Sequence, residues 1–214
     1  EAEEYAIEVG INDIMIAGGT PAAVFYALQT LRQLIEDDGD VQAVAIKDKP
    51  YFAYRGALLD VSRHFFTVAE VKKYIDILAM HKINRFHWHL TDDQGWRIEI
   101  RKHPRLTEVG SVRKQTLVGK HEASNNNYDG IPHGGYYTQD EMRELVAYAK
   151  ERGIEIIPEI EMPGHSEEVL TTYPEIDCRN AYDSNDSSLP MTGSMCPGNE
   201  GTYSFLENVL SEVL

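Results

Sequence analysis

The sequence predicts an α/β chain that comprises the end of a small α/β domain in residues 1–50 and part of a (β/α)8 TIM barrel in residues 51–214. Three observations support this fold class. Apolar strand-like segments alternate with amphipathic helices, as in βαβ units around a parallel sheet. The long polar connections follow strands, where such barrels build their active sites. About 164 residues remain after position 50, fewer than the roughly 250 of a whole barrel, so we expect only its first three β/α repeats.

In the first domain, residues 5–9 and 13–17 are short apolar segments around Gly10-Ile11-Asn12, which predicts a hairpin. Thr20 and Pro21 are typical N-cap and first-turn residues and predict a helix that ends near Asp37. Residues 41–46 predict one more strand, and Lys47-Asp48-Lys49-Pro50 is the expected domain boundary.

Three strands, at 54–61, 83–90 and 154–160, are expected in the barrel part. Capping boxes predict the starts of three helices, because a Ser or Thr is followed three residues later by Glu; they are Thr67-Val68-Ala69-Glu70, Thr138-Gln139-Asp140-Glu141 and Ser204-Phe205-Leu206-Glu207. Gly153 is a typical C-terminal residue for the middle helix.

Composition limits the function classes. The 214 residues carry 20 Lys+Arg and 35 Asp+Glu, a formal net charge of −15, which argues against a nucleic-acid partner. Hydrophobic residues make up 42%, enough for a core. No apolar run reaches the roughly 20 residues of a membrane span, and the acidic first residues are unlike a signal peptide.

Cys178 and Cys196 are the two cysteines, and both lie in one polar stretch. In an extracytoplasmic protein this spacing would suit a disulfide, whereas in a cytosolic protein both would be free thiols. The sequence does not decide between the two.

Polar residues concentrate near the ends of the expected strands. Arg55 falls within the first strand and could pair internally with Asp60 or present a planar fork of donors to sugar hydroxyls or a carboxylate. His87 and His89 alternate on the second strand, so they share a face. With Asp92 they could bind a metal, or they could be hydrogen-bonded histidines of the barrel interior.

On the third strand, Glu155, Glu159 and Glu161 also share a face, which would crowd their charges unless some are paired or protonated.

Several motifs, taken in order along the chain, resemble the β-N-acetylhexosaminidases of glycoside hydrolase family 20. They are Arg55-Gly56 with Asp60 to Phe65, His87-Trp88-His89-Leu90-Thr91-Asp92-Asp93-Gln94-Gly95-Trp96-Arg97, Gly134-Gly135-Tyr136-Tyr137-Thr138 and Ile157-Pro158-Glu159-Ile160-Glu161-Met162-Pro163-Gly164-His165. The first fifty residues resemble the end of the small domain that precedes this family's barrel.

The resemblance implies exo-acting removal of terminal β-linked N-acetylglucosamine or N-acetylgalactosamine from glycans, with retention and without a cofactor or metal. The substrate's own 2-acetamido oxygen would be the nucleophile. Arg55 would hold the 3- and 4-hydroxyls of the terminal sugar, and Asp92 and His165 would support the acid/base Glu. Glu161 and Asp93 would be supporting carboxylates one step further from the sugar.

One departure from the family pattern is important. The family's catalytic Asp-Glu pair stands in a His-x-Gly-Gly-Asp-Glu context that is missing from these 214 residues, so both carboxylates would lie beyond Leu214. Asp140-Glu141 belongs to a capping box and does not replace them. We therefore expect the isolated chain to be inactive, and pairing with a second copy could cover its exposed apolar surface.

Two other functions remain open. A metal-dependent barrel hydrolase would use His87 and His89. A carbohydrate-binding remnant would recognise sugar through Arg55, Trp88 and Trp96 without cleaving it. By analogy with the family, the protein is expected outside the cytoplasm, in a secreted, periplasmic or lysosomal location.

Overall fold

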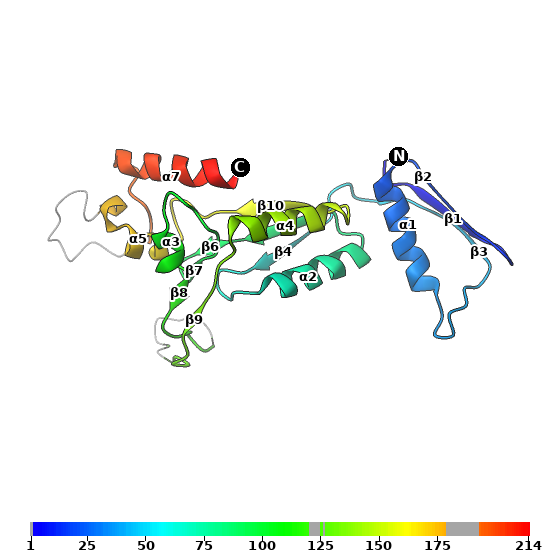
Figure 1. Ribbon diagram of the computed structural model, residues 1–214, viewed down its shortest axis with the longest axis horizontal. Coiled ribbons are helices and arrows are strands. Elements are labelled where there is room, and N and C mark those ends of the chain that lie inside the picture. Colours follow the sequence, from blue (N-terminus) through cyan, green and yellow to red (C-terminus); the bar gives the residue numbers. More distant parts are fainter. Residues whose placement is uncertain (1, 120–124, 126, 179–192) are drawn as a thin grey trace. The chain divides into compact units, whose positions relative to one another are not determined.

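The computed structural model describes residues 2–119, 125, 127–178 and 193–214 (Figure 1). The prediction of a mixed α/β chain is confirmed. The chain forms two compact units. The first unit contains Glu1–Ala57, Ala69–His87 and Glu144–Ile157, and the second contains Leu58–Val68, Trp88–Arg143 and Pro158–Leu214. The predicted domain boundary at residue 50 and the partial barrel stay predictions.

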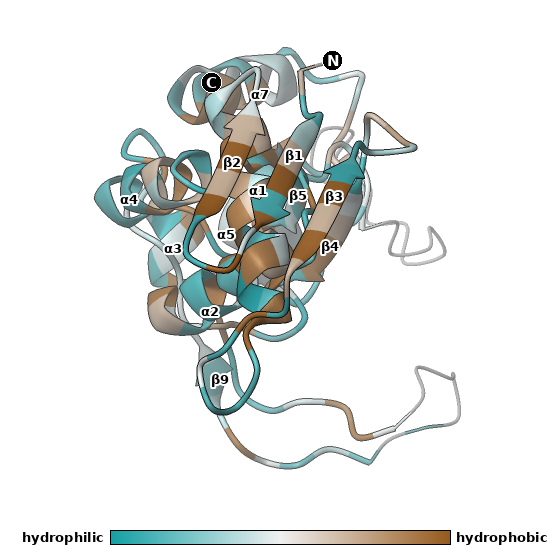
Figure 2. Ribbon diagram, turned by 90° about the vertical axis from the view of Figure 1, so that its right-hand side faces the viewer, coloured by the Kyte–Doolittle hydropathy of each residue, from teal (hydrophilic) through white to brown (hydrophobic). Residues whose placement is uncertain are grey.

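The first unit begins with a three-stranded antiparallel sheet in the order β2-β1-β3. Its strands are β1 (Tyr5–Val9), β2 (Ile14–Gly18) and β3 (Val44–Asp48), so the expected hairpin is confirmed. Figure 2 shows the hydrophobic segments of these strands in brown. Apolar residues of β1 pack with Ala23, Tyr26 and Ala27 of helix α1 (Pro21–Leu34). The Thr20 hydroxyl oxygen accepts the Ala23 N–H at 3.2 Å, which confirms the predicted N-cap.

A second sheet has the strand order β10-β5-β4. Its strands are β4 (Gly56–Asp60), β5 (Arg85–His89) and β10 (Glu155–Glu159). Between β4 and β5, backbone hydrogen bonds join Arg85 to Arg55 and Val61 to His89. Between β5 and β10, they join Glu155 to Asn84 and Leu90 to Glu159. Paired residue numbers therefore increase together, which makes the three strands parallel. The carboxyl ends of all three strands lie at the same edge.

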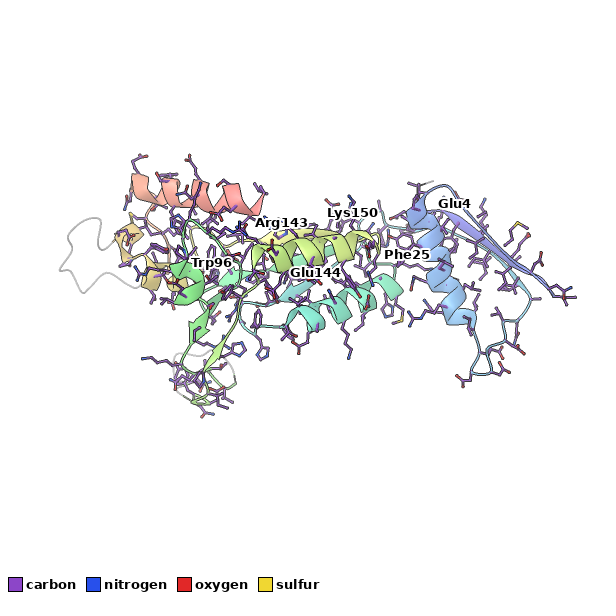
Figure 3. All side chains as sticks on the ribbon, viewed as in Figure 1. Glu4, Phe25, Trp96, Arg143, Glu144 and Lys150 are labelled. Carbon is purple, nitrogen blue, oxygen red and sulfur yellow. A yellow bond between two sulfur atoms is a disulfide. The ribbon has the colours of Figure 1, made fainter. Side chains whose placement is uncertain are left out.

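Two helices belong to these strand–helix repeats, α2 (Val68–Met80) and α4 (Gln139–Lys150). Lys72 of α2 forms an ion pair with Glu144 of α4, whose position Figure 3 labels. The predicted capping box of α4 is confirmed, because the Thr138 N–H donates to Glu141 Oε2 at 2.8 Å and the Glu141 N–H donates to Thr138 Oγ1 at 3.2 Å.

The long connections of the second unit contain short elements. The first connection holds β6 (Thr91–Asp92), β7 (Gly95–Trp96), α3 (Arg105–Glu108), β8 (Val112–Arg113) and β9 (His133–Gly134). The second holds α5 (Glu167–Thr172) and the 3-10 helix η1 (Pro174–Ile176).

The last helix, α7 (Glu200–Val213), begins earlier than predicted. The predicted cap at Ser204 is wrong, because the Asn199 side chain accepts the Gly201 N–H at 2.8 Å and caps the helix there. None of the described helices is both long and apolar enough to cross a lipid bilayer.

Cys178 and Cys196 form a disulfide, which decides the question that the sequence left open. Eighteen positions separate the two cysteines. The Cys196 N–H also donates to the Ile176 carbonyl at 2.8 Å, so this cysteine is attached to η1 by its backbone as well.

Replacing both cysteines, Cys178→Ala with Cys196→Ala, should lower the free energy of unfolding by about 3 kcal/mol, because a loop of this length loses much entropy when the disulfide closes it. Denaturant unfolding of both proteins measures the difference. The parent protein reduced with dithiothreitol is the control and should match the variant. A variant as stable as the oxidised parent would contradict the prediction.

Candidate active site at the strand ends

A buried carboxylate lies at the end of the central strand of the parallel sheet. Asp92 belongs to the small β6–β7 hairpin that follows β5, and it is only 1% exposed. Its Oδ2 accepts a bond from Arg63 Nη2 at 2.6 Å and lies 3.0 Å from His89 Nε2. Its Oδ1 accepts the Asp93 backbone N–H at 2.8 Å. A buried charge is tolerated only when it is paired in this way.

His89, the last residue of β5, is placed between two carboxylates. Its Nδ1 lies 2.6 Å from Glu159 Oε2 at the end of β10, and its Nε2 faces Asp92. Burial lowers the pKa of His89, but the hydrogen bonds to Glu159 and Asp92 outweigh burial, and its pKa lies above the ordinary value of 6.5. Its Nε2 also lies 3.1 Å from Arg63 Nη1, so this nitrogen contacts both a carboxylate and a guanidinium.

Arg63 comes from the turn after β4, and this turn is held by Asp60. Asp60 Oδ1 accepts the backbone N–H groups of Ser62 and Arg63, both at 3.0 Å. Its Oδ2 pairs with Arg63 Nη1 at 2.9 Å, while Gln94 Oε1 accepts Arg63 Nε–H at 3.0 Å. The Arg63 side chain is still 45% exposed, so part of its guanidinium faces solvent.

His165 follows β10 and meets the same carboxylates from another side. Its Nδ1 lies 3.3 Å from Asp92 Oδ1 and 3.4 Å from Asp93 Oδ2, and its side chain is 58% exposed. Its φ of 49° is a left-handed backbone conformation, which is uncommon for histidine. Asp93 Oδ1 also accepts the Glu167 N–H at the start of α5 at 3.2 Å.

Glu161 approaches the centre of this cluster. Its backbone N–H donates to the buried Thr91 hydroxyl oxygen at 2.8 Å. Its carboxylate, the Asp92 carboxylate and a ring nitrogen of His89 have atoms within 4.8 Å of one another. The predicted residues Asp92, Asp93, Glu161 and His165 are therefore brought together within the second unit.

Arg63, Asp92, Asp93 and His165 line a cavity of about 620 Å³, whereas His89 and Glu161 are not among its lining residues. This volume lies within the range of roughly 300–1,000 Å³ that is usual for small-ligand pockets, and both charged and apolar side chains border the cavity. Its lining residues come from the ends of β4, β5 and β10 and from the loop before α4, namely Arg63, Asp92, Asp93, Gln94, Arg113, Gln115, Thr116, Leu117, Gly119, Tyr128 and His165.

Arg55 differs from expectation. It precedes β4 instead of lying within it, and it pairs with Glu3 and not with Asp60, with Nη1 2.9 Å from Glu3 Oε2. Its Nε donates to the Lys82 carbonyl at 2.7 Å and Nη1 to the Phe52 carbonyl at 2.8 Å. These contacts, all within the first unit, occupy the guanidinium. The predicted sugar-binding role of Arg55 stays a prediction that they do not support.

The contacts also bear on the alternative functions. By the closeness of their side-chain atoms, His89, Asp92 and Glu161 could hold a metal ion, and so could Asp92, Asp93 and His165, whereas His87 is in neither group. The metal-dependent alternative therefore stays a prediction, with His89 but without His87. Trp88 and Trp96 (Figure 3 labels Trp96) are 0% and 1% exposed, and Trp96 Nε1 donates to the Ile98 carbonyl at 2.6 Å. The expectation that these two tryptophans recognise sugar is wrong, because both are core residues.

Three residues of the cluster were not predicted as site residues: Arg63, Asp60 and Glu159. The signal that could have identified them is their position, since each lies at or just after the carboxyl end of a parallel strand, where such sheets place their sites. His89 was weighed only as a metal ligand or a core histidine.

Known proteins resemble this chain over nearly its whole length. Residues 52–214 match the model of the glycosyl hydrolase family 20 catalytic domain, and residues 1–49 match that of family 20 domain 2. A β-hexosaminidase of Porphyromonas gingivalis is 42% identical over 99% of this chain, and one of Vibrio furnissii is 42% identical over 98%. The chain spans only 27% and 34% of the length of these two relatives.

A solved structure is similar as well. The crystal structure of an exo β-N-acetylglucosaminidase from Vibrio harveyi in complex with N-acetylglucosamine has a TM-score of 0.84 and 37% sequence identity. The match covers 100% of this chain and 34% of that one.

The His89 ring should titrate above pH 6.5, and Glu159→Gln should lower its midpoint by removing one of the two carboxylates. Because the pKa is raised in the folded protein, the stabilisation from protonated His89 is fully present below about pH 6.5 and is lost as the pH rises through the folded pKa. NMR titration of the ring signals measures both midpoints.

His103 is the internal comparison for this titration, because burial lowers its pKa. Its midpoint should lie below 6.5 and should not respond to the Glu159 substitution. A His89 midpoint below that of His103 would contradict the account of the cluster.

Proposed function

The chain belongs to glycosyl hydrolase family 20, and on that premise we propose that its cavity holds the terminal β-linked N-acetylhexosamine of a glycan during hydrolysis. The observation that carries this proposal is the convergence of Arg63, Asp92 and His165 on one cavity at the strand ends. The names of the relatives, β-hexosaminidases and an exo β-N-acetylglucosaminidase, agree with it.

We propose that Arg63 binds the hydroxyls of the terminal sugar. Its guanidinium lines the cavity and its side chain is 45% exposed, while Asp60 and Asp92 hold it in a fixed direction, so a ligand can reach it. A group fixed at the end of the sugar fits exo-action, since a sugar with a further unit attached at those hydroxyls would be excluded. The Arg55 side chain is only 17% exposed and is bonded to Glu3 and to backbone carbonyls, so it has less to offer a substrate.

The proposed reaction is substrate-assisted and proceeds with retention. The 2-acetamido oxygen attacks the anomeric carbon of the same sugar, which makes the attack intramolecular. A glutamic acid donates its proton to the leaving oxygen and later removes one from water. Asp92 and His165 would hold this glutamic acid and set its pKa, while Glu161 and Asp93 would hold Asp92 and His165.

The two carboxylates nearest to the reaction are missing from these 214 residues. Asp140-Glu141 does not supply them, because Glu141 accepts the Thr138 N–H and hydroxyl and begins α4. We therefore propose that the isolated chain has half of a site and no proton donor. The alternative function, which the absence of these two carboxylates favours, is sugar binding without turnover.

An extracytoplasmic location is also part of the proposal. The disulfide between Cys178 and Cys196 supports it, because disulfides persist mainly outside the reducing cytosol.

The full gene product should hydrolyse p-nitrophenyl N-acetyl-β-glucosaminide, whereas the isolated 214-residue chain should release no nitrophenol above the uncatalysed rate. The physical reason is that the isolated chain lacks the general acid. Glu141→Gln in the full gene product is the control, and it should keep full activity because a glutamine can still cap α4.

Turnover by the isolated, folded chain would overturn the proposal about the missing carboxylates. A full gene product that binds N-acetylglucosamine without cleaving the glycoside would instead favour the binding remnant.

Arg63 and Arg55 should respond differently to the same substitution. Arg63→Met should lower kcat/KM by about 10- to 100-fold, the value of one or two hydrogen bonds from a charged group, and should also lower the unfolding midpoint, because the buried Asp92 carboxylate loses a partner. Arg55→Met should lower the unfolding midpoint, because Glu3 loses its partner, and should leave kcat/KM of the folded enzyme unchanged. The reverse pattern would assign the sugar to Arg55.

A further inference from the structure

Arg97 is a buried arginine of the second unit that the proposed function does not use. Its side chain follows β7 and the residue is 0% exposed. Its guanidinium donates to four backbone carbonyls, those of Val61 at 3.1 Å, Ser62 at 2.7 Å, Ser111 at 2.5 Å and Gly135 at 3.0 Å.

The charge of Arg97 is stabilised in an unusual way. Among the described residues, no carboxylate lies within ion-pair distance of it, and the four carbonyl oxygens take the place of a counterion. Burial lowers the pKa of Arg97 to about 10, so the group is still charged at neutral pH. A buried, unpaired cation is costly for a fold, and an apolar side chain would fill the same space at a lower cost.

The four carbonyls belong to segments that build the cavity. Val61 and Ser62 directly precede Arg63, Ser111 directly precedes β8, and Gly135 directly follows β9. The last residue of β8, Arg113, donates from Nη2 to the Arg63 carbonyl at 2.9 Å. The Arg97 guanidinium therefore fixes the backbone just before the cavity arginine, and the Arg113 guanidinium binds the carbonyl of that arginine.

The side chain of Arg97 is packed so closely that two neighbouring positions have no room for a Cβ atom. A Cβ at Gly95 would lie 2.3 Å from Arg97 Nη2, and a Cβ at Gly135 would lie 2.3 Å from the Phe65 ring. The Phe65 ring itself is 5.9 Å from the Arg97 guanidinium carbon. Glycine at these two positions allows the close approach of the three segments to the guanidinium.

We propose that Arg97 is a positioning residue that sets the location of the Arg63 guanidinium in the cavity. This inference rests on the proposed function, in which Arg63 binds the terminal sugar. A lysine could not replace Arg97, because one ammonium group cannot reach carbonyls in four directions from a planar fork.

A double-mutant cycle in the full gene product tests the proposal. Arg97→Lys should lower kcat/KM by about 10- to 100-fold when Arg63 is present, since small displacements of a positioning group have effects of this size. In an Arg63→Met background the same substitution should change kcat/KM by less than about 2-fold, because no Arg63 guanidinium is left for Arg97 to position. Arg101→Lys, exposed and in the same connection, is the matched control and should have no effect in either background.

NMR of the Arg63 Nε–H group gives a second readout that does not depend on turnover. This group donates to Gln94, and Arg97→Lys should shift its signal and speed its exchange with water, whereas Arg101→Lys should not. A parent protein without turnover would overturn the proposed function, and the NMR comparison would still decide the role of Arg97.

Equal losses of kcat/KM in both backgrounds, or an unmoved Arg63 signal, would overturn the proposal. If Arg97→Lys does not fold, Gly95→Ala serves as the second variant, because its methyl group would displace the guanidinium without removing the charge. It should lower kcat/KM only in the presence of Arg63, and a loss of the same size in the Arg63→Met background would reject the proposal.

Discussion

The buried Asp92 carboxylate is the constraint on which the site depends. A charge that is 1% exposed requires partners, and the fold supplies them from three strand ends: Arg63 after β4, His89 on β5 and His165 after β10. Each partner is in turn held by another carboxylate, Asp60, Glu159 or Asp93. These contacts therefore fix side chains that come from distant parts of the sequence.

The same arrangement explains why the cavity can be polar and ordered at once. Arg63 and His165 keep exposed atoms in the cavity while their other atoms are bound to Asp92, so their orientation is set before a ligand arrives. The Arg97 guanidinium donates hydrogen bonds to the two backbone carbonyls just before Arg63. The ends of the three parallel strands are thus connected through Asp92, and the segment after β4 is held in addition by the Arg97 hydrogen bonds.

Local signals predicted much of the fold. The Thr20 cap, the capping box at Thr138 and the strands β1, β5 and β10 follow from short-range chemistry. The α7 start was missed because Asn199 competes with Ser204 as a cap. In the site, motif resemblance identified Asp92 and His165. It did not separate Arg55 from Arg63, because the choice depends on non-local pairing, with Glu3 for one arginine and with Asp92 for the other.

The most direct measurement of the central claim is a crystal structure of the full gene product with N-acetylglucosamine bound. The account predicts that the sugar occupies the cavity beside Asp92, with its hydroxyls within hydrogen-bond distance of the Arg63 guanidinium, while Arg55 keeps its ion pair with Glu3. A sugar bound at Arg55, or one that leaves Arg63 without contact, would contradict it.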